Sequence, residues 1–268
     1  VISMPALENN AIIEYAYTVD ELGRGPLGRH FQDEFLFQDI DPMMISRYSL
    51  TVPKGMEIYY KVYNGDISPE IEEKGNSVTY IWEAKNTPQI IQEDYMPPLA
   101  DIVPRLEITT FKDWQEVAGW YYDITTPKTK PDEAIKAKVI ELTKDKKTLE
   151  DKVKAIYYFV TNEVRYVGLE FGIGGLMPHQ ASEVFKYKYG DCKDKATLLI
   201  SMLREIDVPA HYVLVRTRYI GSLPLESPGF QFDHAICAIK LDGKLYFLDG
   251  TAEDTRFGYI PSMDQGTK

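Results

Sequence analysis

The alternation of apolar and polar positions changes in character along the chain. From Ala11 to about Thr110 the apolar residues stand in short runs rich in Ile, Tyr, Val and Thr, which predict strands at residues 11–19, 45–52 and 78–82. Asn64-Gly65 is typical of a hairpin turn. Prolines punctuate the stretch and disfavour long helices. The first part of the chain is therefore predicted to be β-rich.

A change to helical spacing begins after residue 110. Phe111, Trp114 and Tyr121 fall on one helical face, and Thr109-Thr110 precede them as expected caps. We predict a connecting helix in this segment. An aromatic stripe of this kind packs against a neighbouring element far more often than it binds a ligand, so no chemistry is assigned to Trp114 or Trp120.

The remainder of the chain has helical spacing first and alternation afterwards. Helices are predicted to begin near Pro131, at Thr148, near Ser182 and at Cys192, the last running to about Arg204. Strands are predicted at residues 212–216, 232–241 and 244–249, the last two joined by an Asp242-Gly243 turn. Helices followed by an antiparallel sheet favour an α+β fold with the helices on one side of the sheet. The predicted division is a β-rich, sandwich-like domain at 1–110, a helical connector at 111–130 and an α+β domain at 131–268.

Charge and composition narrow the choice of partners. Residues 1–125 contain 21 acidic and 9 basic residues, and the rest contain 20 and 21, which together give the net charge of −11. Nucleic acid is an unsuitable partner, because phosphate binding requires a basic face. No apolar run is long enough to span a bilayer, and no signal peptide precedes the first predicted strand. With two cysteines and no Cys/His ligand spacing, neither a disulfide framework nor a metal or other cofactor is predicted.

The candidate nucleophile is Cys192. Gly190 and Asp191 suit the break and the cap before a helix, so the thiol is expected at a helix N-terminus. Unpaired N–H groups and the helix dipole stabilise negative charge there and favour the reactive thiolate. Lys193 and Lys195 are expected to add positive potential. Cys192 also shares an apolar stripe with positions 196, 199 and 203, which directs its sulfur toward the sheet.

The predicted hairpin supplies a base and a carboxylate. If Asp242-Gly243 is a two-residue turn, Leu241 pairs with Lys244, and His234 and Asp249 become diagonal neighbours on one sheet face. Asp249 can then orient the imidazole while His234 accepts the thiol proton and returns it to the leaving group.

The same register places Cys237 on the other face of the sheet, as a buried structural thiol. A Cys192–Cys237 disulfide is the competing interpretation, disfavoured because the two side chains should approach the sheet from different layers. His30, His179 and His211 have no carboxylate at a suggestive spacing and are interpreted as structural, although His179 is close to a Gly-rich loop and could line a cleft.

The motifs Tyr189-Gly190-Asp191-Cys192-Lys193, Val208-Pro209-Ala210, Asp233-His234-Ala235 and Leu248-Asp249-Gly250-Thr251 together resemble the core of the transglutaminase-like superfamily, whose fold is similar to papain's. The similarity covers about residues 131–255. The first half resembles a β-rich domain of unknown function that precedes such cores in bacterial proteins, and we expect the sequence to begin partway into that domain. Gly250 stands where the family often has Pro.

This resemblance implies a cysteine-dependent acyl transfer on peptide or amide substrates, with hydrolysis through a covalent acyl-enzyme preferred over protein cross-linking. The alternative is a non-catalytic module in which the β-rich half contacts a protein or glycan. An oxyanion hole is also required. The Cys192 N–H is one expected donor, and the resemblance implies Tyr166 as the second, with Gln180 as runner-up. Export signals are typical of such proteins, so the resemblance implies a periplasmic or cell-envelope location.

Overall fold

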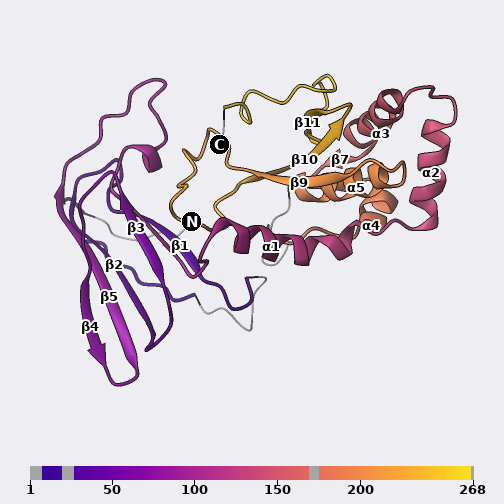
Figure 1. Ribbon diagram of the computed structural model, residues 1–268. Coiled ribbons are helices and arrows are strands. Elements are labelled where there is room, and N and C mark those ends of the chain that lie inside the picture. The colour runs from indigo at the N-terminus through magenta and orange to yellow at the C-terminus, as the bar shows by residue number, and fades with distance from the viewer. Residues whose placement is uncertain (1–7, 20–26, 169–174, 267–268) are drawn as a thin grey trace.

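The structure is a computed structural model that describes residues 8–19, 27–168 and 175–266. Figure 1 shows the strands of the N-terminal half gathered at one end of the molecule and most of the helices at the other. The C-terminal segment folds back along the second half toward the middle of the molecule.

The N-terminal strands among residues 27–168 form two three-stranded antiparallel sheets. One has the order β1 (Gln32–Leu36), β6 (Arg105–Thr109), β3 (Tyr59–Tyr63), and the other β2 (Met43–Pro53), β5 (Ser77–Thr87), β4 (Glu70–Lys74). Trp82 of the second sheet is buried in one cluster with Leu106 and Ile108 of the first, so the two sheets share a small apolar core. The strands predicted at 45–52 and 78–82 are confirmed.

Two expectations for this half are wrong. Residues 11–19 are irregular, and Ile12, Tyr15 and Tyr17 are exposed, because no neighbouring strand pairs with this segment among the described residues. Asn64-Gly65 does turn the chain, with Asn64 at φ 57°, but β3 pairs with β6 and β4 with β5, so this turn connects two sheets. The hairpin turn of this region is Gly75-Asn76, between β4 and β5.

The helices follow the predicted apolar spacing. Their bounds are α1 Trp114–Thr125, α2 Glu133–Thr143, α3 Leu149–Glu163, α4 Ala181–Tyr187 and α5 Cys192–Arg204, with short 3-10 turns η1 at Leu99–Asp101 and η2 at Thr126–Thr129. Thr148 caps α3 as predicted, by accepting a hydrogen bond from the Asp151 N–H at 3.0 Å. The cap of α1 was predicted wrongly. Asp113 caps it by accepting from the Glu116 N–H, while Thr109 belongs to β6.

The C-terminal sheet has the antiparallel order β11 (Lys244–Leu248), β10 (His234–Leu241), β9 (Ala210–Val215), and α5 packs along β10 and β9. A parallel pair of short strands, β7 (Arg165–Tyr166) and β8 (Tyr189–Gly190), lies immediately before α5. Apolar residues of α2 to α5 and of this sheet form one continuous core. The predicted α+β architecture with helices packed on an antiparallel sheet is confirmed.

The two halves meet through the long connection between β9 and β10. Arg216 is buried and donates to Glu34 of β1 at 3.1 Å, and the Gln32 side chain donates to the Phe230 carbonyl at 2.7 Å. Trp114 of α1 donates to the Leu225 carbonyl at 2.7 Å. Because β10 begins with His234, the segment that leads into the candidate site is held by the β-rich half.

Candidate active site

Cys192 is the first residue of α5, and a reciprocal capping arrangement fixes the point where this helix begins. The Asp191 carboxylate accepts from the Asp194 N–H at 3.2 Å, and the Asp194 carboxylate accepts from the Asp191 N–H at 3.2 Å. Gly190 is required before the cap, since a Cβ there would lie 2.5 Å from the Asp194 Cβ. The Cys192 side chain thus stands at the positive end of a long helix, as the sequence predicts.

The surroundings of α5 differ from the expected single apolar stripe. Every residue from Cys192 to Leu203 is buried, because helices and the sheet enclose α5 on all sides. The Lys193 ammonium group pairs with Asp191, and the Lys195 ammonium group donates to carbonyl groups at the end of α3. Both lysine charges are therefore engaged within the fold, and burial lowers the pKa of Lys195.

His234 and Asp249 lie together at the ends of β10 and β11. The predicted register is confirmed from Leu241–Lys244 to Cys237–Leu248, where the ladder ends. Beyond that point the His234 Nε2 and Asp249 Oδ2 atoms are 3.3 Å apart, and both side chains are buried. Asp249 Oδ1 accepts from the N–H and hydroxyl of Thr251 at 2.8 and 2.7 Å. The carboxylate is thus fixed on one oxygen and faces the imidazole with the other.

The electrostatics favour a charged imidazole beside a charged carboxylate. Burial acts to lower the pKa of His234, but its interactions with Asp249 and with Cys192 outweigh burial and raise the pKa to about 10. Burial acts to raise the pKa of Asp249, but His234 and Thr251 outweigh it and the pKa is lowered. Cys192 is among the groups that raise the pKa of His234, so the thiol lies within electrostatic range of the ring.

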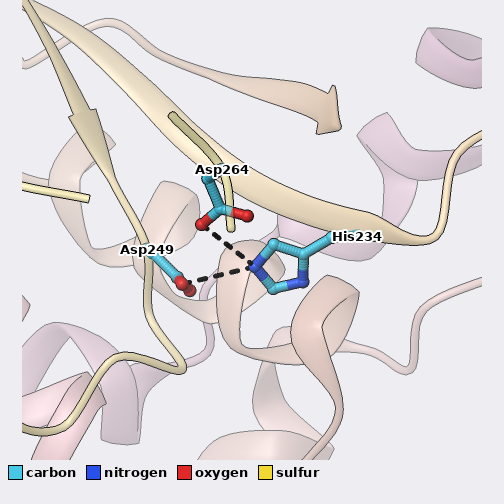
Figure 2. Close-up of side chains that lie close together, drawn as sticks. All are labelled: His234, Asp249 and Asp264. Atoms are coloured by element: carbon cyan, nitrogen blue, oxygen red, sulfur yellow. Dashed lines mark ion pairs between the residues drawn. The ribbon is translucent and has the colours of Figure 1, made fainter. Parts of the chain in front are cut away.

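Asp264 is a second buried carboxylate at the same ring, and sequence reasoning missed it. Figure 2 shows its carboxylate and that of Asp249 approaching the same ring nitrogen of His234. The distance from His234 Nε2 to Asp264 Oδ2 is 3.9 Å, and burial raises the pKa of Asp264 to about 6. The C-terminal segment is held in place by Arg218, which donates to the Gln265 carbonyl at 2.7 Å through Nε and to the Met263 carbonyl at 3.2 Å through its N–H. Asp264 follows irregular chain with no recognisable motif, so the sequence carries no signal for it.

The two predicted oxyanion donors stand on either side of the Gly-rich loop. Tyr166 lies in β7 opposite Gly190 of β8, two residues from the nucleophile, and its side chain is partly exposed. Gln180 is the N-cap of α4, and its N–H donates to Glu183 Oε2 at 3.2 Å. Neither assignment is tested by these contacts, and both stay predictions.

Two other residues of the sequence analysis are now placed. His179, which has no carboxylate at a suggestive spacing in the sequence, does have one in the structure: its Nδ1 lies 3.1 Å from Asp194 Oδ2 and its N–H donates to Asp194 Oδ1 at 2.7 Å. Asp194 is 15 residues away in α5, whereas His179 precedes α4, and no short spacing reveals this pair. Cys237 is fully buried, burial raises its pKa to about 12, and both cysteines are free thiols. Cys237 therefore has the features of a structural thiol.

His234, Asp249 and Asp264 also form a set of metal-ligating groups. One donor atom from each lies within 4.8 Å of the others, and all three side chains are buried. An imidazole with two carboxylates is a donor set that divalent metals accept. A metal on Nε2 would need that nitrogen unprotonated, whereas the raised pKa of His234 favours the protonated ring. The geometry accordingly fits an imidazolium held between carboxylates better than a metal centre.

Comparison with known families agrees with this geometry. Residues 136–247, which run from α2 into β11, match the profile of the Transglutaminase-like superfamily. Residues 1–91 match DUF3857, a domain of unknown function with solved structures. The chain therefore carries a transglutaminase-like core behind a DUF3857 region. No match was found among curated proteins.

A solved structure supports the fold. A crystal structure from Parabacteroides distasonis, described as a candidate protease, is 19% identical, with a TM-score of 0.74, and the match covers 85% of this chain and 44% of that one. The chain thus spans less than half of that relative. A candidate cysteine protease from Cytophaga hutchinsonii (16% identity, TM-score 0.37, 83% and 78% covered) and the periplasmic domain of TgpA from Pseudomonas aeruginosa (12%, 0.33, 82% and 76%) are more distant. At these two scores the likeness does not establish a shared fold.

Proposed function

We propose that this chain is a cysteine-dependent acyl-transfer enzyme that hydrolyses peptide or amide bonds, with Cys192 as nucleophile, His234 as general acid and base, and Asp249 as the carboxylate that orients His234. The observation that carries the proposal is the contact between His234 and Asp249 next to a thiol at a capped helix start. Tyr166 or Gln180 would join the Cys192 N–H in the oxyanion hole.

The reaction proceeds in two halves. In the first, the proton of Cys192 is already on His234, in keeping with the raised pKa of the ring; the sulfur bonds to the substrate carbonyl carbon, the C–N bond breaks, and the His234 imidazolium gives its proton to the departing amine. In the second, water gives a proton to the neutral His234 and adds to the thioester carbon, and the C–S bond breaks to release a carboxylic acid and restore the sulfur beside the protonated ring. A lysine amine in place of water would give a cross-link.

Domain division and location belong to the same proposal. We divide the chain into a sandwich-like domain at 1–110, a connector at 111–130 and a catalytic core at 131–268, since the apolar clusters fall on either side of the connector. Within the described ranges, no helix combines the length and apolar character that crossing a bilayer demands. A periplasmic or cell-envelope location is proposed from the resemblance alone, since export signals are typical of proteins that carry these two regions.

The β-rich half is proposed to contact a protein or a glycan. The support is a set of exposed apolar and aromatic side chains on its strands, namely Met44 and Ile45 of β2, Tyr59 and Tyr60 of β3, and Ile71 of β4. Aromatic rings at a surface suit both kinds of ligand, because they combine apolar area with a polar edge.

Thiol labelling and turnover test the catalytic proposal. We expect iodoacetamide at neutral pH to modify Cys192 and not the buried Cys237, and we expect Cys192→Ala to abolish release of new amino termini from denatured casein. Cys237→Ala is the matched control and should retain activity if its circular dichroism spectrum is unchanged. Preferential labelling of Cys237, or full activity in Cys192→Ala, would refute the proposal. Incorporation of a fluorescent primary amine into casein without new amino termini would assign cross-linking instead.

A further inference from the structure

A groove of about 330 Å³ runs between α1 and β9, an edge strand of the C-terminal sheet. In Figure 1 α1 passes alongside β9 on the side away from β10. The walls are mainly apolar and aromatic: Trp114, Val117, Ala118, Tyr121, Tyr212 and Phe232. The volume is near the lower end of the roughly 300–1,000 Å³ found for ligand pockets, which suits one or two large side chains.

The groove adjoins the proposed catalytic centre without containing it. Cys192, His234 and Asp249 do not line it, but Phe232 precedes His234 by two residues, and Leu214 in its wall pairs with Ala235. On the other side the Tyr212 hydroxyl contacts the Thr197 hydroxyl of α5. The wall of the groove thus includes β9, which pairs with the strand that carries His234, and Arg204 at the end of the helix that begins with Cys192.

The hydroxyl group of Tyr121 is a polar group in the otherwise apolar wall of the groove. The side chain is 4% exposed, and its ring packs edge-on against Tyr212 with centroids 5.5 Å apart. Within the described part of the chain, its hydroxyl has no hydrogen-bond partner. Burial raises the pKa of Tyr121, and Tyr212, Cys192 and Asp191 raise it further, which places this hydroxyl within electrostatic range of the helix start. A buried hydroxyl without a partner is uncommon and suits a ligand acceptor.

The charge of the lining also restricts the occupant. Among the described residues, no Asp or Glu lines the groove, although the chain as a whole carries a net charge of −11. The guanidinium group of Arg204 is engaged with Thr129 Oγ1 and the Ala210 carbonyl, both at 2.9 Å. A basic side chain would find no counter-ion in the groove, whereas an uncharged apolar side chain would lose little on leaving water.

We propose that this groove binds a large apolar side chain, aromatic or long aliphatic, of the peptide whose acyl group is transferred to Cys192, and that the Tyr121 hydroxyl donates a hydrogen bond to a carbonyl of that peptide. The inference rests on the proposed function, since it assigns the substrate class of the same site. Tyr121 acts here as a substrate-binding residue, and α1 contributes to the choice of substrate.

Binding to an inactive variant tests the groove separately from catalysis. Fluorescently labelled pentapeptide amides with Phe, Ser or Lys at the central position and Gly elsewhere would be titrated into Cys192→Ala, with anisotropy as the readout. The Phe peptide should bind at least ~10-fold more tightly than the Ser and Lys peptides, because only its side chain buries a large apolar area. Affinities equal within about twofold, or no binding of any peptide at millimolar concentration, would overturn the proposal.

Substitutions on α1 locate the binding. Ala118 is exposed and lines the groove, so Ala118→Trp in the Cys192→Ala background should fill it and weaken Phe-peptide binding ~10-fold. Gln115 is equally exposed but does not line the groove, so Gln115→Trp should change the affinity less than about twofold. Equal effects of the two substitutions would exclude this groove as the binding site.

Tyr121→Phe separates a binding role from a structural one. The change keeps the ring and removes a buried hydroxyl that has no partner among the described residues, so the free protein should melt at the same or a higher temperature. Peptide affinity should nonetheless fall by about 3- to 10-fold, because the hydrogen bond to the carbonyl is lost. A lower melting temperature with unchanged affinity would contradict the assignment.

The groove and the catalytic proposal can fail separately. If the protein binds peptides selectively but its Cys192 resists labelling, the groove proposal stands and the catalytic proposal is rejected. If casein cleavage depends on Cys192 but peptide affinity does not depend on the central side chain, the catalytic proposal stands and the groove proposal is rejected.

Discussion

The two halves of this protein differ in how completely their side chains are buried. In the β-rich half, β4 is exposed along its whole length, and the shared core of the two sheets is small. In the second half, α5 is enclosed on every side and belongs to a core that extends over four helices and a sheet. The candidate catalytic groups are all in the second half. A densely packed core limits the rotamers of the groups that it surrounds, so accurate positioning of reactive side chains is expected where packing is most complete.

The largest expected effect tests that positioning directly. Asp249→Ala should lower the turnover of a peptide substrate by about 10³- to 10⁴-fold, because His234 loses the carboxylate that orients it. Asp254→Ala, at an exposed position five residues away, is the matched control and should change turnover less than about twofold. Steady-state kinetics at neutral pH measures both. A comparable loss in the two variants would mean that the buried contact is unimportant for the reaction.

The next effect compares the two halves by stability. Leu199→Ala in α5 should lower the free energy of unfolding by about 2–5 kcal/mol, since it leaves a cavity in a fully buried core. Ile71→Ala in β4 should lower it by less than about 1 kcal/mol, because this side chain is already more than half exposed. Urea titration followed by circular dichroism gives both values. If both substitutions lowered the free energy of unfolding equally, the difference in packing between the two halves would not contribute to stability.

The smallest effect concerns pH and Asp264. Its folded-state pKa of about 6 is above the ordinary aspartate value, so protonation favours the folded state: the stabilisation is complete below the ordinary value and is lost as pH rises through about 6. Asp264→Asn should remove this loss, which is about 1–3 kcal/mol for a rise of the pKa from 3.8 to about 6. Between pH 4 and 7 the melting temperature of the wild type should therefore fall relative to the variant.

Asp254→Asn serves as the control for this pH experiment, because Asp254 is exposed in the same C-terminal segment. Its melting curve should follow that of the wild type across the range. Parallel curves for Asp264→Asn and the wild type would show that Asp264 does not titrate in the way its burial indicates.

The sequence predicted local features better than contacts between segments that are distant in the chain. The start of α5, the Thr148 cap and the β10–β11 register depend on residues close in sequence, and each was predicted correctly. The pairing of β3 with β6 instead of β4 depends on which edges meet in three dimensions, and neighbouring residues do not encode that choice.

The candidate site shows the same distinction. His234 and Asp249 could be placed together because a two-residue turn links their strands. Asp264 and the His179–Asp194 pair could not be predicted, since irregular chain brings Asp264 to the imidazole and a separate helix brings Asp194 to His179. Recognisable turns transmit register along the chain, whereas loops without a motif do not.

The return of the C-terminal segment to His234 has a consequence for exchanging this unit between proteins. The family match ends at residue 247, before both carboxylates that face the imidazole. A fragment cut at that boundary would keep Cys192 and His234 and lose Asp249 and Asp264. A transplant or library based on this core would have to extend past Asp264 to Gln265, whose carbonyl holds the segment through Arg218, or the exchanged unit would carry a thiol and an imidazole without their acidic partners.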